Sequence, residues 1–297
     1  MKEKTAFLFA GQGAQFVGMG ADFFTGMSGG VYDVMRDGPI EELSKTINAQ
    51  PAIYLHGLAV AEELRCRGIV PDCVAGFSLG EVPALVFAGA MKQSEGLEFV
   101  GVRAEAMQRA CEENVGAMLA VVRLPIAKVE EIVRGFEDVW VANYNSPEQV
   151  VCSCEIAQVD AFSAAVASAG GRALRLKVSG AFHSPLMADA RLVVEDWLDS
   201  RDLRNLKIPC YSNWTGELYV HDYKERMAFQ IQESVLWIDV IENMLADGVR
   251  TFVEVGPGNV LAGLVKKITE HNGTEGVKIF SAGDMAGVDA VVEEIGS

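Results

Sequence analysis

Ser78 stands at the centre of a Gly-Phe-Ser-Leu-Gly segment at 76–80, between a short apolar run and a helical pattern. A sharp turn from a strand into a helix holds the central side chain of such a segment in a strained, exposed position, and the flanking glycines remove Cβ clashes. The main-chain N–H of Leu79 can then point at a developing oxyanion, helped by the N-terminus of the helix. The pattern predicts a nucleophilic serine, with an ordinary turn as the alternative.

A serine nucleophile needs a base, and the sequence offers four histidines. His183 lies in the small-residue segment at 179–185, directly before a predicted helix, which is where site residues gather in open α/β sheets. His56 falls within a helical pattern, and His221 and His271 lie in polar surroundings. By elimination His183 is the best candidate for the base; a structural histidine is the alternative.

The bulk composition predicts a globular protein with few kinds of partner. The chain has 297 residues, half of them hydrophobic, which is enough for one large domain or for a large domain with a smaller insertion. No uninterrupted apolar stretch of about 18 residues occurs, so a spanning helix is not expected. The net charge of −16 disfavours nucleic acid and anionic membranes as partners. The N-terminus lacks the long apolar region of a secretory signal, so we expect a cytoplasmic protein.

The six cysteines show no zinc-ligand spacing. The one close pair, Cys152 and Cys154, suits alternate positions on a strand better than a metal site. We therefore expect reduced thiols and no bound metal.

Strands alternate with helices in the first and last thirds of the chain, which predicts an α/β fold with a largely parallel sheet covered on both faces. The predicted strands there are 6–10, 73–75, 208–212 and 251–255. The predicted helices are 51–67, a segment through 85–86, 94–111, 187–200, 222–232, 238–247 and one around 261–268.

Between 116 and 180 the order changes to strand, helix, two strands, helix and strand. The strands are predicted at 117–122, 139–144, 149–154 and 172–178, and the helices at 126–136 and 155–169. This βαββαβ order matches the split ferredoxin-like motif. We therefore predict a small inserted subdomain at 116–180, with residues 1–115 and 181–297 forming the large catalytic subdomain.

Seven motifs follow one another along the chain in the order found in a known family. They are FAGQGAQ at 9–15, the serine turn followed by Glu81, Arg103 within 102–107, GAM at 116–118, ANYNSPEQ at 142–149, GAFHSP at 180–185 and EVGPG at 254–258. On these motifs the chain resembles the malonyl-CoA:acyl carrier protein transacylases over about residues 6–285. Any one of these motifs is weak evidence for the family, whereas seven of them in the family's order are highly specific for it.

The resemblance implies a large α/β-hydrolase-like subdomain with a ferredoxin-like insertion, in agreement with the insertion predicted above. It implies that the backbone carbonyl of Gln230, rather than an aspartate, orients His183. It also implies a second oxyanion donor, the main-chain N–H of Gln12, beside that of Leu79.

By the same resemblance, Arg103 grips the free carboxylate of a malonyl group, because a planar guanidinium can make two parallel bonds to it. A solvated surface position is the alternative for this arginine. Phe182 fits family members that take malonyl rather than branched groups, and Asn143 and Asn145 are expected to bind substrate. Phe77 replaces the family's usual histidine, which removes a polar contact and is expected to loosen selectivity.

The activity implied is a two-step transfer of malonyl from malonyl-CoA to the phosphopantetheine thiol of acyl carrier protein, through an acyl-Ser78 intermediate, for fatty acid biosynthesis. No cofactor is then needed, and we expect a monomer. The alternatives are a hydrolase that clears acyl groups from carriers, an inactive docking subunit, and the same transfer serving a polyketide or malonate decarboxylase system. An acidic carrier would need local basic patches on this acidic chain. The candidates are Lys266 with Lys267, and Arg175 with Lys177.

Overall fold

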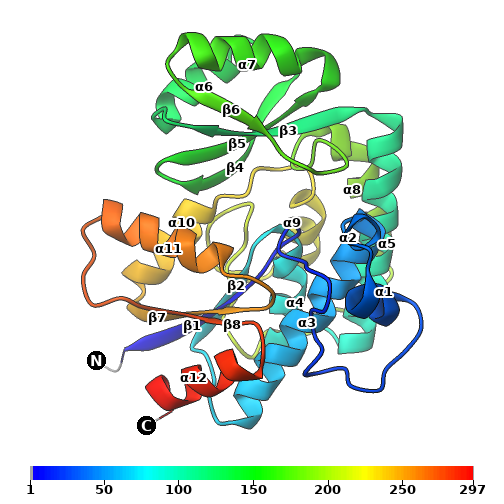
Figure 1. Ribbon diagram of the computed structural model, residues 1–297, viewed down its shortest axis with the longest axis vertical. Helices are drawn as coiled ribbons and strands as arrows, with labels where there is room; N and C mark the ends of the chain where they lie inside the picture. Colours follow the sequence, from blue (N-terminus) through cyan, green and yellow to red (C-terminus); the bar gives the residue numbers. More distant parts are fainter. Residues whose placement is uncertain (1–2, 297) are drawn as a thin grey trace.

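The computed structural model, which describes residues 3–296, contains two separate four-stranded sheets (Figure 1). The first sheet is parallel, with the strand order β2-β1-β7-β8. Its strands are β1 (Lys4–Phe9), β2 (Cys73–Gly76), β7 (Val249–Val255) and β8 (Lys278–Ala282). Phe9 pairs with Gly76 on one side and with Val255 on the other, so the turns after these three strands meet at one edge of the sheet.

Helices cover both faces of the parallel sheet (Figure 1). They are α3 (Thr46–Cys66), α4 (Glu81–Ala88) and α12 (Met285–Ile295) on one face, and α10 (Trp237–Ala246) and α11 (Val260–His271) on the other. Along β1, Phe7 and Phe9 pack toward the first group, whereas Ala6 and Leu8 pack toward the second. All four side chains are fully buried, as a strand covered on both faces requires.

Outside these layers, α5 (Gln93–Glu113) packs against both α3 and α8 (Ala188–Asp199). The shorter helices are α1 (Val31–Asp37), α2 (Ile40–Leu43) and α9 (Tyr223–Phe229). Within residues 3–296, no helix is both long and apolar enough to cross a membrane.

The second sheet is antiparallel, with the order β4-β5-β3-β6. Its strands are β3 (Gly116–Val122), β4 (Val139–Ser146), β5 (Gln149–Glu155) and β6 (Arg172–Arg175). The helices α6 (Ile126–Val133) and α7 (Val159–Ser168) cover the outer face of this sheet (Figure 1). Leu119 packs under these helices, whereas Met118 faces the large core. The α/β class and the βαββαβ order are confirmed; the subdomain boundaries at 116 and 180 stay predictions.

The prediction of a strand at 208–212 is wrong. Only isolated bridges form there, one of them between Cys210 and Val74. Val74 donates to the Pro209 carbonyl and accepts from the Tyr211 N–H, but a proline has no N–H with which to continue the ladder. The segment nevertheless runs beside β2 and leads to the turn that follows this strand.

The connection from β2 to α4 is a 3-10 turn at Ser78–Gly80. Close packing of the main chain leaves no room for a side chain at Gly76 or Gly80, the two glycines that flank the turn. A Cβ on Gly76 would lie 1.9 Å from the Gly80 carbonyl carbon, and a Cβ on Gly80 would lie 2.1 Å from the Phe9 carbonyl oxygen. Both glycines are therefore required by the close approach of backbone to backbone.

We expect Gly80→Ala to destabilise the fold, because the new methyl group would overlap the β1 main chain. The expected loss in the free energy of unfolding is about 1–3 kcal/mol, measured by urea denaturation. Gly101→Ala is the matched control, since a Cβ at this α5 position meets nothing within 4 Å. The control should gain about 0.5–1 kcal/mol from helix propensity; equal stability of the two variants would contradict the packing described.

Candidate active site

A cavity of about 430 Å³ lies at the carboxyl edge of the parallel sheet, between it and the antiparallel sheet. Ser78, His183 and Arg103 all line it. Most of the wall is apolar, and Met118 and Val151 contribute from the antiparallel sheet. A mainly apolar cavity with a few converging polar groups is the usual form of a small-molecule site.

Ser78 and His183 lie 105 positions apart in the sequence and are in contact in the structure. The Ser78 hydroxyl Oγ is 2.8 Å from His183 Nε2. Both residues adopt left-handed backbone conformations, with φ of 51° and 55°. Such conformations cost about 1–3 kcal/mol each and concentrate at functional sites. The His183 main-chain N–H donates to the Ile231 carbonyl at 3.1 Å, which holds the loop that carries the imidazole.

The second imidazole nitrogen determines the tautomer. His183 Nδ1 lies 2.9 Å from the Gln230 carbonyl oxygen and 3.1 Å from that of Glu233. Because carbonyl oxygens only accept, Nδ1 carries the hydrogen, and Nε2 is free to accept the proton of Ser78. The Gln230 carbonyl therefore lies where the family resemblance placed it.

The protonation state of His183 is set by its surroundings. Burial, and then the positive charge of Arg103, lower the pKa of the imidazole to about 4. The hydrogen bonds to the Glu233 and Gln230 carbonyls act in the opposite direction. The ring is therefore neutral near pH 7, which is the form that can take a proton from a serine.

The side chain of Gln230 connects Ser78 to Arg103. Its Nε2 donates to the Ser78 carbonyl at 2.6 Å, and its Oε1 accepts from Arg103 Nη2 at 3.1 Å. Together with the bond from its own carbonyl to His183, Gln230 thus contacts all three residues predicted to act on a substrate, Ser78 through its main-chain carbonyl. The sequence motif accounted for the carbonyl and not for the amide.

Arg103 is a buried cation, 1% exposed, whose Nη1 donates to Gln50 Oε1 at 2.7 Å. Within residues 3–296, no carboxylate oxygen lies within 4.0 Å of its charged nitrogens. Burial lowers its pKa to about 10, so it remains protonated at neutral pH. A buried charge with only neutral partners is costly. An anionic ligand in the cavity would compensate it.

The other residues predicted at the site divide into two groups. Those that line the cavity are Gln12, Phe77, Asn143, Asn145 and Phe182. The ring of Phe77 lies edge-on to Trp237, with 5.3 Å between the ring centroids. The side chain of Leu79 is instead buried in the core. The oxyanion role of the Gln12 and Leu79 N–H groups stays a prediction.

Three buried polar residues beside the site received no role from the sequence: Gln50, Glu81 and Asn213. Burial raises the pKa of the Glu81 carboxyl to about 7. A polar residue at a position that the pattern predicts to be buried is the signal that could have found them. Gln50 and Glu81 both stand within or beside otherwise apolar helical patterns.

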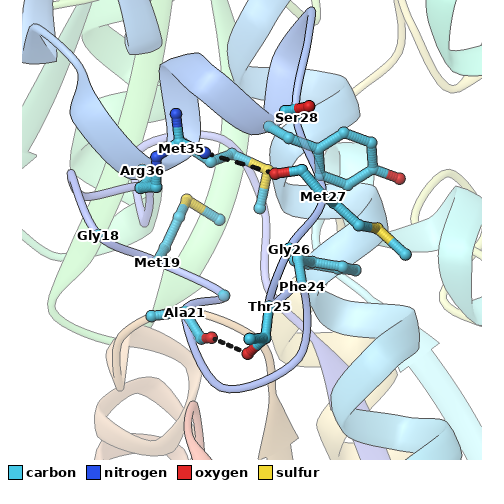
Figure 2. Close-up of a pocket in the computed structure, with 12 residues that line it drawn as sticks. Gly18, Met19, Ala21, Phe24, Thr25, Gly26, Met27, Ser28, Met35 and Arg36 are labelled. Atoms are coloured by element: carbon cyan, nitrogen blue, oxygen red, sulfur yellow. Dashed lines mark hydrogen bonds between the residues drawn. The ribbon is translucent and has the colours of Figure 1, made fainter.

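A second cavity, of about 380 Å³, lies between the segment 18–28 and α1 (Figure 2). Its lining includes Met19, Met27 and Met35, and its one cation, Arg36, donates to the Met27 carbonyl. It shares no lining residue with the first cavity, and no histidine lines it. It therefore lacks the nucleophile and base that the first cavity brings together.

Comparison with known proteins points to one family. The family described as "Acyl transferase domain" matches residues 24–287. A malonyl CoA-acyl carrier protein transacylase of Bacillus subtilis is 36% identical over 289 residues, covering 90% of this chain and 91% of that relative.

Solved structures agree with this similarity. The malonyl CoA-acyl carrier protein transacylase of Clostridium perfringens has a TM-score of 0.91 at 34% identity, covering 98% of this chain and 97% of its own. A malonyl-transacylase in complex with a type II PKS acyl-carrier protein also has a TM-score of 0.91, at 29% identity, covering 98% of this chain and 99% of its own.

Replacing Arg103 with glutamine should raise the pKa of His183, because it removes a positive charge that disfavours the imidazolium. The pKa should move from about 4 toward the ordinary value of 6.5, as followed by NMR titration of the imidazole Cε1–H resonance. The control is Arg109→Gln, an exposed arginine of the same helix that pairs with Glu113. An unchanged titration in Arg103→Gln would show that this charge does not act on the imidazole.

Proposed function

Because the chain belongs to the acyl transferase family, we propose that it transfers a malonyl group from coenzyme A to the phosphopantetheine thiol of an acyl carrier protein, in fatty acid synthesis. The observation that carries the proposal is the buried guanidinium of Arg103, in the same cavity as Ser78 and His183. In the described part of the chain this cation has neutral hydrogen-bond partners only. The free carboxylate of a malonyl group would supply the matching negative charge.

In the first step, His183 Nε2 takes the hydroxyl proton of Ser78 while Oγ attacks the thioester carbonyl carbon. The carbonyl electron pair moves onto oxygen, and the main-chain N–H groups of Gln12 and Leu79 stabilise the oxyanion. When the carbonyl re-forms, the carbon–sulfur bond breaks, and the imidazolium returns its proton to the departing coenzyme A thiolate. Ser78 is left as a malonyl ester.

The second step runs through the same groups with the carrier as nucleophile. His183 takes the proton of the phosphopantetheine thiol, and the sulfur attacks the ester carbonyl. Collapse of the second tetrahedral intermediate breaks the bond to Ser78 Oγ, which regains its proton from the imidazolium. Both steps use only groups of the protein and the substrates' own atoms, so we propose that neither a metal nor a redox cofactor takes part.

A hydrolase would use the same Ser78 and His183 with water as the acceptor. Two features favour transfer. The apolar walls, which include Met118 and Phe182, offer a water molecule few hydrogen-bond partners. A deacylating hydrolase also has less need for a carboxylate clamp such as Arg103. The same transfer could serve a polyketide carrier, and its assignment to fatty acid synthesis is part of the proposal.

We propose that the enzyme is a cytoplasmic monomer without nucleic-acid or membrane partners. Its six cysteines are free thiols, and all but Cys66 are buried, which is typical of a reducing compartment. The net charge of −16 supports the exclusion of polyanionic partners.

Incubation with malonyl-CoA should add one malonyl group to the protein, seen by intact mass, and added carrier should remove it. Ser78→Ala should abolish the adduct, and His183→Ala should slow its formation by about 10²–10⁴-fold, because the general base is lost. Arg103→Ala should shift labelling from malonyl-CoA toward acetyl-CoA, because the clamp on the free carboxylate is lost.

Ser168→Ala is the matched control for the nucleophile, since this serine is exposed on α7 and its hydroxyl donates to the Ala164 carbonyl. It should be labelled like the parent protein. A parent protein that is never acylated on Ser78 would overturn the proposed function. Strong labelling of the parent by acetyl-CoA would indicate that Phe77 loosens the selectivity of the pocket.

The carrier should dock beside the mouth of the cavity through two basic pairs. Arg175 and Lys177 are exposed, and Lys177 lines the cavity; Lys266 and Lys267 are exposed on α11. Neutralising both pairs should raise the apparent KM for the carrier more than the KM for malonyl-CoA, because complementary charge steers the acidic carrier and only Lys177 of the four residues lines the cavity.

The control for charge removal is neutralisation of Lys128 and Arg134, at α6 on the outer face of the small sheet (Figure 1). This change should alter neither KM. Equal effects of the four-residue variant on carrier and malonyl-CoA would contradict the docking assignment.

A further inference from the structure

Asn213 contacts the main chain on both sides of Phe77, directly before the proposed nucleophile. Its Oδ1 accepts from the Ser78 main-chain N–H at 2.6 Å, and its Nδ2 donates to the Gly76 carbonyl at 2.7 Å. The side chain therefore bridges the last residue of β2 and the first residue of the 3-10 turn. Asn213 is fully buried and does not line the cavity.

The contact with Ser78 satisfies a donor that the fold would otherwise leave without a partner. The N–H groups of the first residues in a helical turn have no partner within that turn, and Ser78 is the first residue of its turn. The residue is also held at a φ of 51°, which is unfavourable for a residue with a side chain. A buried acceptor on its N–H stabilises this conformation at the point where Oγ must be aimed.

Asn213 is itself held through its main chain. Its N–H donates to Glu81 Oε2 at 2.7 Å, and its carbonyl accepts from the Leu236 N–H at 2.8 Å. The other oxygen of Glu81 accepts from the Tyr219 hydroxyl. All three residues, Asn213, Glu81 and Tyr219, are buried. With the two side-chain bonds, each polar group of Asn213 has a partner, so the amide has a single orientation.

We propose that Asn213 is a positioning residue, which holds the Ser78 main chain so that Oγ meets His183 Nε2, and that Glu81 and Tyr219 fix Asn213 in place. Asn213 touches neither substrate nor the reacting atoms, and it acts through Ser78. The inference rests on the proposed function, in which Ser78 is the nucleophile. It differs from a purely structural role, which would lower stability and leave the chemistry of the folded protein unchanged.

The test is the rate of Ser78 acylation by malonyl-CoA, followed by rapid-quench intact mass over a range of substrate concentrations. Asn213→Ala should lower the maximal acylation rate by about 10²-fold, because small misplacements of a reacting atom have effects of this size. The substrate concentration at half-maximal rate should stay within about twofold, because Arg103 and the cavity walls are unchanged. Tyr219→Phe should act in the same direction with a smaller effect.

Asn243→Ala is the matched control. Asn243 Nδ2 donates to the Gly216 carbonyl at 3.0 Å, so the same amide-to-carbonyl bond is removed away from the cavity. This variant should lose thermal stability and acylate at the parental rate. The comparison separates a loss of stability from a loss of alignment.

A parental acylation rate in folded Asn213→Ala would overturn the proposal. If Asn213→Ala does not fold, the acylation rate of Tyr219→Phe becomes the test. A parental rate in Tyr219→Phe would then overturn the proposal equally. A parent protein without any acyl adduct would instead show that the proposed function is wrong, and the positioning role would fall with it. A rate lost to the same extent in Asn243→Ala would assign the effect to stability alone.

Discussion

The geometry of the site depends on Gln230, which contacts Ser78, His183 and Arg103 through three different atoms. Its carbonyl accepts from the imidazole, its amide nitrogen donates to the serine carbonyl, and its amide oxygen accepts from the guanidinium. Because these bonds share one buried residue, a displacement of any one group moves the others. Groups that come from three distant parts of the chain are thereby held in one frame, as a preorganised site requires.

The buried positive charge of Arg103 acts on the other groups of this site. Arg103 is bonded to the neutral amides of Gln50 and Gln230. Its charge therefore remains available to a ligand, and it also helps keep His183 neutral. The carboxyl of Glu81 offsets this charge only in part, because burial raises its pKa to about 7 and about half of it is therefore protonated at pH 7. The same cation thus lies where it would bind an anionic group, and after burial it is the second cause of the lowered pKa of His183.

The two sheets meet at the loop that carries His183. On the large side, the His183 N–H donates to the Ile231 carbonyl; on the small side, the Ser153 hydroxyl donates to the Phe182 carbonyl. The antiparallel sheet also supplies Met118 and Val151 to the cavity wall. The position of His183 relative to Ser78 therefore depends on how the antiparallel sheet packs against the parallel one, and the antiparallel sheet is part of the candidate site rather than an addition to it.

Residue types and local spacing were sufficient to predict the two-sheet α/β fold, the turn around Ser78 and the pairing of this serine with His183. The fold and the turn follow from hydrophobic periodicity and turn chemistry, which act over a few residues. The pairing was predicted by eliminating the other three histidines, because its two residues lie 105 positions apart. The prediction of a strand at 208–212 was wrong because Pro209 cannot continue a ladder of hydrogen bonds. The strand β8 and the helix α12 were not predicted at all.

Tertiary structure alone decided which polar residues are buried and what they touch. From the sequence, Arg103 is one arginine on a predicted helix, which is typical of a solvated surface position. The packing of α5 against α3 and α8 instead buries it beside Gln230. Asn213 reaches Ser78 because its segment runs beside β2, 135 positions away in the sequence. Contacts of this range depend on how the elements pack and not on the local pattern. The sequence therefore determined which residues are the candidate nucleophile and base, and the packing determined their alignment and placed the charge of Arg103 beside them.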